Sequence, residues 1–171
     1  MAIVVEDGTG LTNADSYISV ADADTYFSIL PTTLTSSWDA LSTTDKENYL
    51  KWATRVLDTK TEFEGDKTVE ASALRWPRKC VTDRDGIDID DNVVPKEVEN
   101  ATVELVRILL GEDITTGQDV DNLKFIKVDV IELEYQDDTA QNRIPAYIND
   151  VLNGVGTFTS GRRQAVRITK V

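Results

Sequence analysis

The sequence predicts a mainly α protein: a compact helical bundle of four to five helices with a small β-hairpin or arm and an extended C-terminal tail. Three observations lead to this fold class. Apolar residues recur at helical spacing in several segments, one segment alternates as a strand does, and the end of the chain carries a short alternating stretch after a glycine-rich one. The 171 residues suffice for one domain with a real core. We expect a helical domain at residues 1–153 and an extended basic tail at 154–171.

Capping signals mark the first helices. SVAD at 19–22 resembles a capping box and predicts a helix over about 19–30, which the following proline would stop. The polar segment PTTLTSS comes next and is predicted to be a loop. STTD at 42–45 is a second capping signal, and the apolar residues behind it predict the clearest amphipathic helix of the chain, over about 43–60.

Trp52, within that second helix, has two interpretations. Its indole could be a platform on which nucleic-acid bases stack, or it could be one of the aromatic residues that fill the core. The core position is favoured, because Tyr49, Ala53 and Val56 share the helical spacing of a buried face.

The second half of the chain combines helices with one strand. EASALRW at 70–76 predicts a short helix that ends at the next proline. The segment 95–111 begins with a proline at the first helical position, and its apolar face is wide enough for a central, buried helix. Residues 124–135 alternate as a β arm, whose change of phase indicates a bulge, a bend or a second short strand. A last helix is expected at about 144–153, followed by eight flexible residues.

The composition excludes several classes of site. A chain with no histidine and one cysteine cannot form a Cys/His zinc site, a Ser-His-Asp or Cys-His hydrolytic site, or an internal disulfide. We therefore expect no enzyme, no catalytic residue, no metal and no cofactor. No apolar run approaches the roughly 18–20 residues that span a membrane, and the N-terminus does not resemble a secretory signal. We expect synthesis in the cytoplasm and no membrane partner.

The charge is large and unevenly distributed. A formal net charge of −13 repels phosphate backbones and argues against a general electrostatic groove for nucleic acid. Residues 1–66 carry 4 basic and 12 acidic side chains, whereas the tail at 154–171 carries no acid, a pattern typical of an interaction segment. The alternating end of the tail can pair with the strand at 124–135 or with the sheet edge of another protein. The residues predicted to dock this tail onto a partner are Arg162, Arg163, Val166, Arg167, Ile168 and Lys170.

The stretch LRWPRKCVTDRDG suggests a metal site or a reactive thiol. A calcium loop with Gly86 at its sixth position would place Val81 at the first and Asn92 at the twelfth, so two main ligands are missing. We therefore expect the Asp-rich loop at 83–91 to be an Asp–Gly turn in a solvated acidic segment, with a weak cation contact left open. Cys80 follows two basic residues, but without a histidine or a second thiol a buried or incidental cysteine is favoured.

The same stretch holds the only basic–aromatic cluster of the predicted helical domain, which consists of Arg75, Trp76, Arg78 and Lys79. Its members could contact single-stranded nucleic acid or a protein partner. The favoured alternative is a structural corner in which Trp76 packs under Pro77. Any contact with a subunit or another partner is predicted to use Arg75, Trp76, Arg78 and Arg84.

Several segments together resemble one family of tailed-phage proteins. No single motif is strong, but their order and spacing are specific, and the resemblance extends to about residue 153. The family is labelled as DnaT-like single-stranded-DNA-binding proteins, and its members also look like the head–tail connector (adaptor) proteins of phage necks. The segments are VVEDGTGL, ADSYISVADADTYF, Trp38, ATRVLDTK, LRWPR with VTDRDG, the Pro95 helix and IKVDVIELEY.

The resemblance implies two alternative functions. A head–tail connector would form a homo-oligomeric ring, typically of twelve copies, beneath the portal protein. It would extend the DNA channel and dock the next tail or neck component, with the tail at 154–171 reaching the portal. Such a protein is a structural virion component of the phage neck, made in the host cytoplasm, and genomic DNA passes through it without specific binding.

The second function is that of a DnaT-like replication protein that binds single-stranded DNA. The acidic composition favours the connector, because an acidic channel repels phosphate rather than holding it. A replication protein would be expected to show a basic groove with several aromatic residues.

Overall fold

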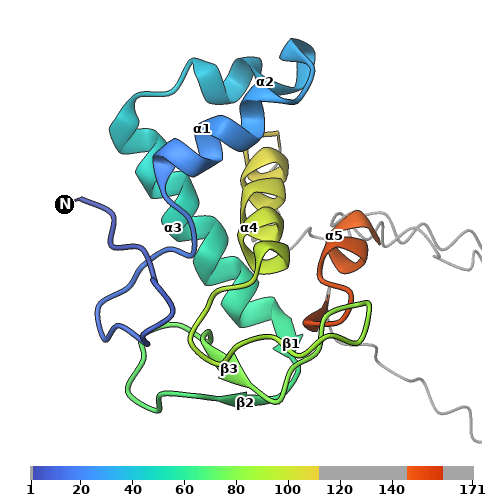
Figure 1. Ribbon diagram of the computed structural model, residues 1–171. Coiled ribbons are helices and arrows are strands. Elements are labelled where there is room, and N and C mark those ends of the chain that lie inside the picture. Colours follow the sequence, from blue (N-terminus) through green and yellow to red (C-terminus); the bar gives the residue numbers. More distant parts are fainter. Residues whose placement is uncertain (1, 112–145, 160–171) are drawn as a thin grey trace, which may run out of the picture.

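The computed structural model describes residues 2–111 and 146–159, and Figure 1 shows their arrangement. The described residues are mainly helical, as predicted, with two pairs of short antiparallel strands. The elements in chain order are α1 (Val20–Ser28), α2 (Thr32–Asp39), α3 (Thr43–Lys60), β1 (Thr61–Phe63), β2 (Asp66–Lys67), β3 (Arg78–Lys79), α4 (Lys96–Leu109), α5 (Ala146–Val151) and β4 (Gly156–Phe158).

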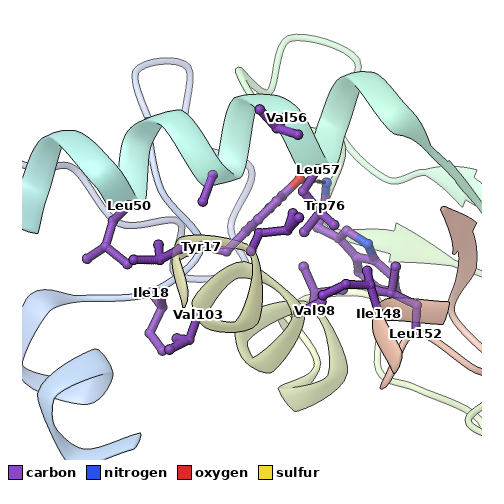
Figure 2. Packing of buried hydrophobic residues seen from close by; sticks show 14 of the residues in the cluster. Tyr17, Ile18, Leu50, Val56, Leu57, Trp76, Val98, Val103, Ile148 and Leu152 are labelled. Carbon is purple, nitrogen blue, oxygen red and sulfur yellow. Dashed lines mark hydrogen bonds between the residues drawn. The ribbon is translucent and has the colours of Figure 1, made fainter. Parts of the chain in front are cut away.

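The helices α3 and α4 pack side by side at the centre of the core (Figure 1). Leu50, Ala53 and Leu57 recur along one face of α3 and are fully buried. On α4, Val103 and Leu105 are both fully buried although they are two residues apart and therefore point to different sides of the helix. This confirms a central α4 that is buried on several faces. Figure 2 shows side chains from α3, α4 and α5 meeting in one cluster.

Both predicted capping signals are present. The Ser19 hydroxyl accepts a hydrogen bond from the backbone N–H of Asp22 at 3.1 Å, and the Ser42 hydroxyl accepts one from Asp45 at 3.2 Å. Each serine also donates its hydroxyl proton to the aspartate carboxylate. Aspartate thus replaces the usual glutamate of a capping box, and it places negative charge in the first turn, where the helix dipole favours it.

The segment predicted to be a loop after Pro31 is a helix, α2. Trp38 explains the difference. Its ring is fully buried and stacks on Phe27 with centroids 4.7 Å apart, and its indole N–H donates to the Asp24 carboxylate at 2.8 Å. Burial of this aromatic ring outweighs the weak helix propensity of the threonines and serines around it.

The short helix predicted for EASALRW is also wrong, since turns and bends occupy this segment. The Ser72 hydroxyl donates to nearby backbone carbonyls, and the N–H groups of Arg75 and Trp76 donate to the hydroxyl of Tyr17. These partners replace the i to i−4 hydrogen bonds that a helix would need. A distant residue therefore determines the local structure here.

Residues predicted to be flexible after the last helix form the strand β4. It pairs antiparallel with β1, with Thr61 opposite Phe158. Val155 and Phe158 are buried. The Asn149 side chain accepts a hydrogen bond from the Phe158 N–H at 2.7 Å and donates one to the Phe158 carbonyl at 3.2 Å. The first residues of the predicted tail thus belong to the folded body.

A bundle of four to five helices is not confirmed. α1 and α2 pack across one end of the α3–α4 pair, and α5 packs against α4 and β4 (Figure 1). The predicted β arm at 124–135 and residues 160–171 of the predicted tail lie outside the described residues. Within the described ranges, none of the helices has the length and apolar character that a membrane span needs.

Candidate nucleic-acid interface

Four basic residues gather around the short ribbon of β2 and β3. Lys67 lies opposite Arg78 in the ribbon, and Asp66 lies opposite Lys79, so Lys67 and Arg78 share one face. Arg75 precedes β3 and is close enough for its charge to act on Arg78. We call Lys67, Arg75, Arg78 and Lys79 the basic corner. Sequence analysis had selected the last three but not Lys67.

A buried tyrosine positions the basic corner. The Tyr17 hydroxyl donates to the Asp58 carboxylate at 2.5 Å and accepts from the N–H groups of Arg75 at 3.1 Å and Trp76 at 3.3 Å. The second Asp58 oxygen also accepts from the Arg75 N–H at 3.2 Å. The chain at 75–76 is therefore tied to the N-terminal segment and to the end of α3.

Trp76 lies beneath the corner and not on its surface. Its side chain is fully buried, and its ring packs edge-on against Phe63 of β1 with centroids 6.0 Å apart. Pro77 is buried behind it, and the Trp76–Pro77 peptide bond is cis. In this structure the tryptophan of the predicted contact set serves packing, whereas contact by Arg75, Arg78 and Arg84 stays a prediction.

The Arg78 guanidinium is held by backbone carbonyls. It donates to the carbonyls of Glu64 at 2.6 Å and of Gly65, with longer contacts to those of Phe63 and Arg75. Desolvation and the neighbouring Arg75 charge lower the pKa of Arg78 from its ordinary value. Arg78 therefore closes the turn between β1 and β2, and no carboxylate of the described residues forms an ion pair with it.

The cations of the described residues fall into two groups. Four of them, on α3 and α4, form ion pairs: Lys46, Lys51, Lys96 and Arg107. The others have no carboxylate within 4 Å among the described residues, and all lie between positions 55 and 84. The positive charges between positions 55 and 84 are thus not neutralised by ion pairs with the described carboxylates. This group is Arg55, Lys60, Lys67, Arg75, Arg78, Lys79 and Arg84.

Asp58 is a half-buried carboxylate next to the basic corner. Burial raises the pKa of its carboxyl above the ordinary 3.8, and hydrogen bonds from Tyr17 and Arg75 offset only part of this rise. The folded state therefore binds this proton more tightly than the unfolded state. The resulting stabilisation is complete below the unfolded pKa near 3.8 and is lost as pH rises through the folded pKa.

An Asp58→Asn variant removes this titration. The free energy of unfolding of the variant minus that of the wild type should therefore increase between about pH 3 and about pH 7. Urea unfolding followed by far-UV circular dichroism at several pH values measures this difference. If this difference stays constant or decreases as pH rises, the Asp58 carboxyl is not the titrating group.

The acidic loop beyond Cys80 forms the predicted Asp–Gly turn. The Asp83 carboxylate accepts from the N–H groups of Asp85 and Ile87, and Gly86 adopts φ +80°. Across the described ranges, no group of acidic side chains is arranged to hold a metal ion. Cys80 is exposed, so of the two favoured alternatives, a buried or an incidental cysteine, burial is wrong.

The glycine-rich loop near the N-terminus binds a carboxylate of its own chain. Glu6 is buried and accepts from the N–H groups of Gly8 at 3.0 Å, Gly10 at 2.8 Å and Leu11 at 2.9 Å. Backbone N–H groups in such a concave loop could otherwise hold an external anion. Because Glu6 occupies them, this loop is not part of the candidate interface.

Sequence reasoning missed the residues that position the site. Tyr17 and Asp58 act on the corner across 58 and 17 positions of sequence, measured to Arg75. No local pattern signals such a contact. Trp52, the other residue considered for base stacking, is half-buried, packs against the core and lies next to Tyr49 with ring centroids 6.2 Å apart.

Comparison with known proteins adds one family. A family model described as "Putative DnaT-like ssDNA binding protein" matches residues 1–170. Neither a curated protein nor a solved structure matches the chain.

The family match contradicts the head–tail connector interpretation, which is therefore wrong. That interpretation was preferred because the net charge of −13 suits a surface that repels DNA. Net charge averages over the whole chain, whereas the cations without ion pairs are concentrated at one end of the described body. The portal partner, the ring and the virion location were inferred only together with the connector.

Proposed function

Because the chain belongs to this family of DnaT-like single-stranded-DNA-binding proteins, we propose that it binds single-stranded DNA and that the basic corner contacts the phosphates. The observation that carries the proposal is the set of cations at the corner, none of which forms an ion pair within 4 Å with a carboxylate in the described part of the chain. Residues 74–84 carry four basic side chains and one acidic one. A role in replication goes with this activity.

Each cation of the corner has a distinct part in this proposal. Lys79 is exposed and reaches a phosphate as a mobile point charge. Arg75 is exposed and makes one long side-chain contact, 3.4 Å to the carbonyl of Thr61, so most of its donors are available for a phosphate. Arg78 and Lys67 are held by backbone carbonyls and supply fixed positive potential.

The acidic remainder of the protein limits this binding. Outside the corner, the negative charge of the protein repels the phosphates of the strand. The contact should therefore involve only a few nucleotides. For single strands the logarithm of affinity falls with the logarithm of salt by about 0.7 per neutralised phosphate. Contact with three or four phosphates predicts a slope of roughly −2 to −3.

Removing two corner charges tests the proposal. Fluorescence anisotropy of a labelled single-stranded oligonucleotide, titrated at several salt concentrations, should give this slope for the wild type. An Arg75→Gln, Lys79→Gln variant should bind about tenfold or more weakly at low salt, with a slope closer to zero by about 1.4. The matched control is Lys96→Gln, which removes an exposed charge that Glu99 already neutralises and should change neither quantity.

Three other results of these binding measurements would contradict the proposal or move the contact elsewhere. Absence of salt-dependent binding by the wild type at low ionic strength contradicts the proposed function. Equal binding by the corner variant and the control removes the corner from the interface. A chain ending at residue 159 examines the tail cations Arg162, Arg163, Arg167 and Lys170. If it loses binding while the corner variant keeps it, the DNA contacts the tail and not the corner.

A further inference from the structure

A polar cavity of about 440 Å³ opens next to the basic corner. Its walls come from the end of β1, from the residues after β3 and from the α5–β4 connection. The volume lies within the range of about 300–1,000 Å³ that is usual for small-molecule sites. Its polar lining residues include Glu64, Cys80, Thr82, Asn153 and Thr157.

The cavity is continuous with the corner through the backbone. Arg78, which closes the turn after β1, donates to the carbonyl of Glu64, and the Glu64 residue lines the cavity. Lys79 is followed directly by Cys80, which lines it from the other side. Lys79 is thus the corner cation next in sequence to the cavity wall, so a strand bound at Lys79 would run close to the cavity.

The walls of the cavity are preformed. Gly154 has φ +97°, and a Cβ atom placed there would lie 2.6 Å from the backbone nitrogen of Arg84, so the α5–β4 connection lies directly on the acidic turn. On the other side, Asn149 fixes β4 through both polar groups of Phe158. Tight contacts of this kind fix the positions of the segments that form the walls.

The chemistry of the lining selects the ligand. Glu64 provides a carboxylate, Asn153 an amide, and Thr82 and Thr157 hydroxyls, whereas no basic side chain lines the cavity within the described ranges. An anionic phosphate is therefore disfavoured here. A nucleobase offers ring nitrogens and, in cytosine, adenine and guanine, an exocyclic amino group that a carboxylate accepts from. Unstacked bases of single strands are recognised in this way on their Watson–Crick edges.

We propose that this cavity receives one nucleobase with an exocyclic amino group from a strand whose phosphates lie on the basic corner. This inference rests on the proposed function and adds a base preference to it. Cytosine should be preferred over thymine, a pyrimidine of similar size without an amino group. A good polar base contact gives a discrimination of about 1–3 kcal/mol, so oligo(dC) should bind at least about fivefold more tightly than oligo(dT) of equal length.

The single cysteine allows the cavity to be blocked selectively. Because Cys80 is exposed and is the only thiol, a maleimide with a bulky substituent modifies this position alone. Modification should remove the preference for oligo(dC) while the salt dependence of oligo(dT) binding stays unchanged. Cys80→Ser protein treated with the same reagent is the control and should keep the preference. A Glu64→Gln variant, which removes the acceptor charge, should reduce the preference to less than about twofold.

The outcomes separate this inference from the proposed function. Equal affinity of the unmodified protein for oligo(dC) and oligo(dT), with normal salt dependence, overturns the base cavity and leaves the phosphate contact standing. A preference that survives both the maleimide and Glu64→Gln places base recognition elsewhere and also overturns it. If neither oligonucleotide binds at low salt, the proposed function itself fails.

Discussion

Replacing Trp76 with alanine should lower the free energy of unfolding by about 3–5 kcal/mol, as expected for loss of a large buried aromatic side chain. The ring is fully buried between the corner and the core, and Figure 2 shows it next to Leu57 and Ile148. Its indole N–H has no hydrogen-bond partner among the described residues, so the burial of the ring carries the stabilisation. For a protein with a total stability of about 5–15 kcal/mol this is a large share.

Urea unfolding followed by circular dichroism measures this loss, with two controls. Trp76→Phe keeps an aromatic ring and gives up the unpartnered N–H, so it should lose clearly less than the alanine variant. Ile87→Ala shortens a side chain that is 65% exposed and should change stability by less than about 0.5 kcal/mol. If Trp76→Ala is no less stable than Ile87→Ala, Trp76 does not anchor the corner.

Replacing Tyr17 with phenylalanine should lower the free energy of unfolding by about 2–4 kcal/mol. The variant keeps the buried ring but removes the hydroxyl that serves Asp58 and two backbone N–H groups at once. The largest part of the loss comes from leaving the half-buried Asp58 carboxylate with fewer hydrogen bonds. The released segment at 75–76 should also move the cations of the basic corner.

Two measurements on Tyr17→Phe separate stability from position. Urea unfolding gives the stability loss, and anisotropy with single-stranded DNA under folding conditions should show weaker binding than for the wild type. Tyr49→Phe removes the same atom from a half-buried tyrosine of α3, whose hydroxyl has no hydrogen-bond partner among the described residues, and should change neither measurement by much. Unchanged stability and unchanged binding of Tyr17→Phe would show that the corner does not depend on this hydroxyl.

Much of the helical structure could be predicted because its signals are local. The serine caps and the apolar spacing of α3 lie within the segments that they define, and both predictions hold. α2 was missed because its stability comes from Trp38 packing on Phe27 of another helix. The missing helix at 70–76 has the opposite cause, since Tyr17 captures the backbone N–H groups there.

The candidate site was predictable in its charges and not in its geometry. Arg75, Arg78 and Lys79 stand together in the sequence, so they could be selected without a structure. Lys67 lies next to them only because β2 pairs with β3. Strands of two residues are too short to be predicted from an alternating sequence pattern. The polar cavity was likewise hidden, because Glu64, Cys80 and Asn153 come from three separate segments.

The pairing of β1 with β4 has a consequence for how the chain folds as it is made. Thr61 and Phe158 lie far apart in sequence, so β1 leaves a ribosome that adds about 5–20 residues per second several seconds before its partner. During that interval β1 has an unpaired edge, and the Asn149 clamp on Phe158 does not yet exist. Completion of this strand pair must wait until Phe158 has been synthesised. The nascent protein therefore passes through a period in which its exposed strand can pair with another chain.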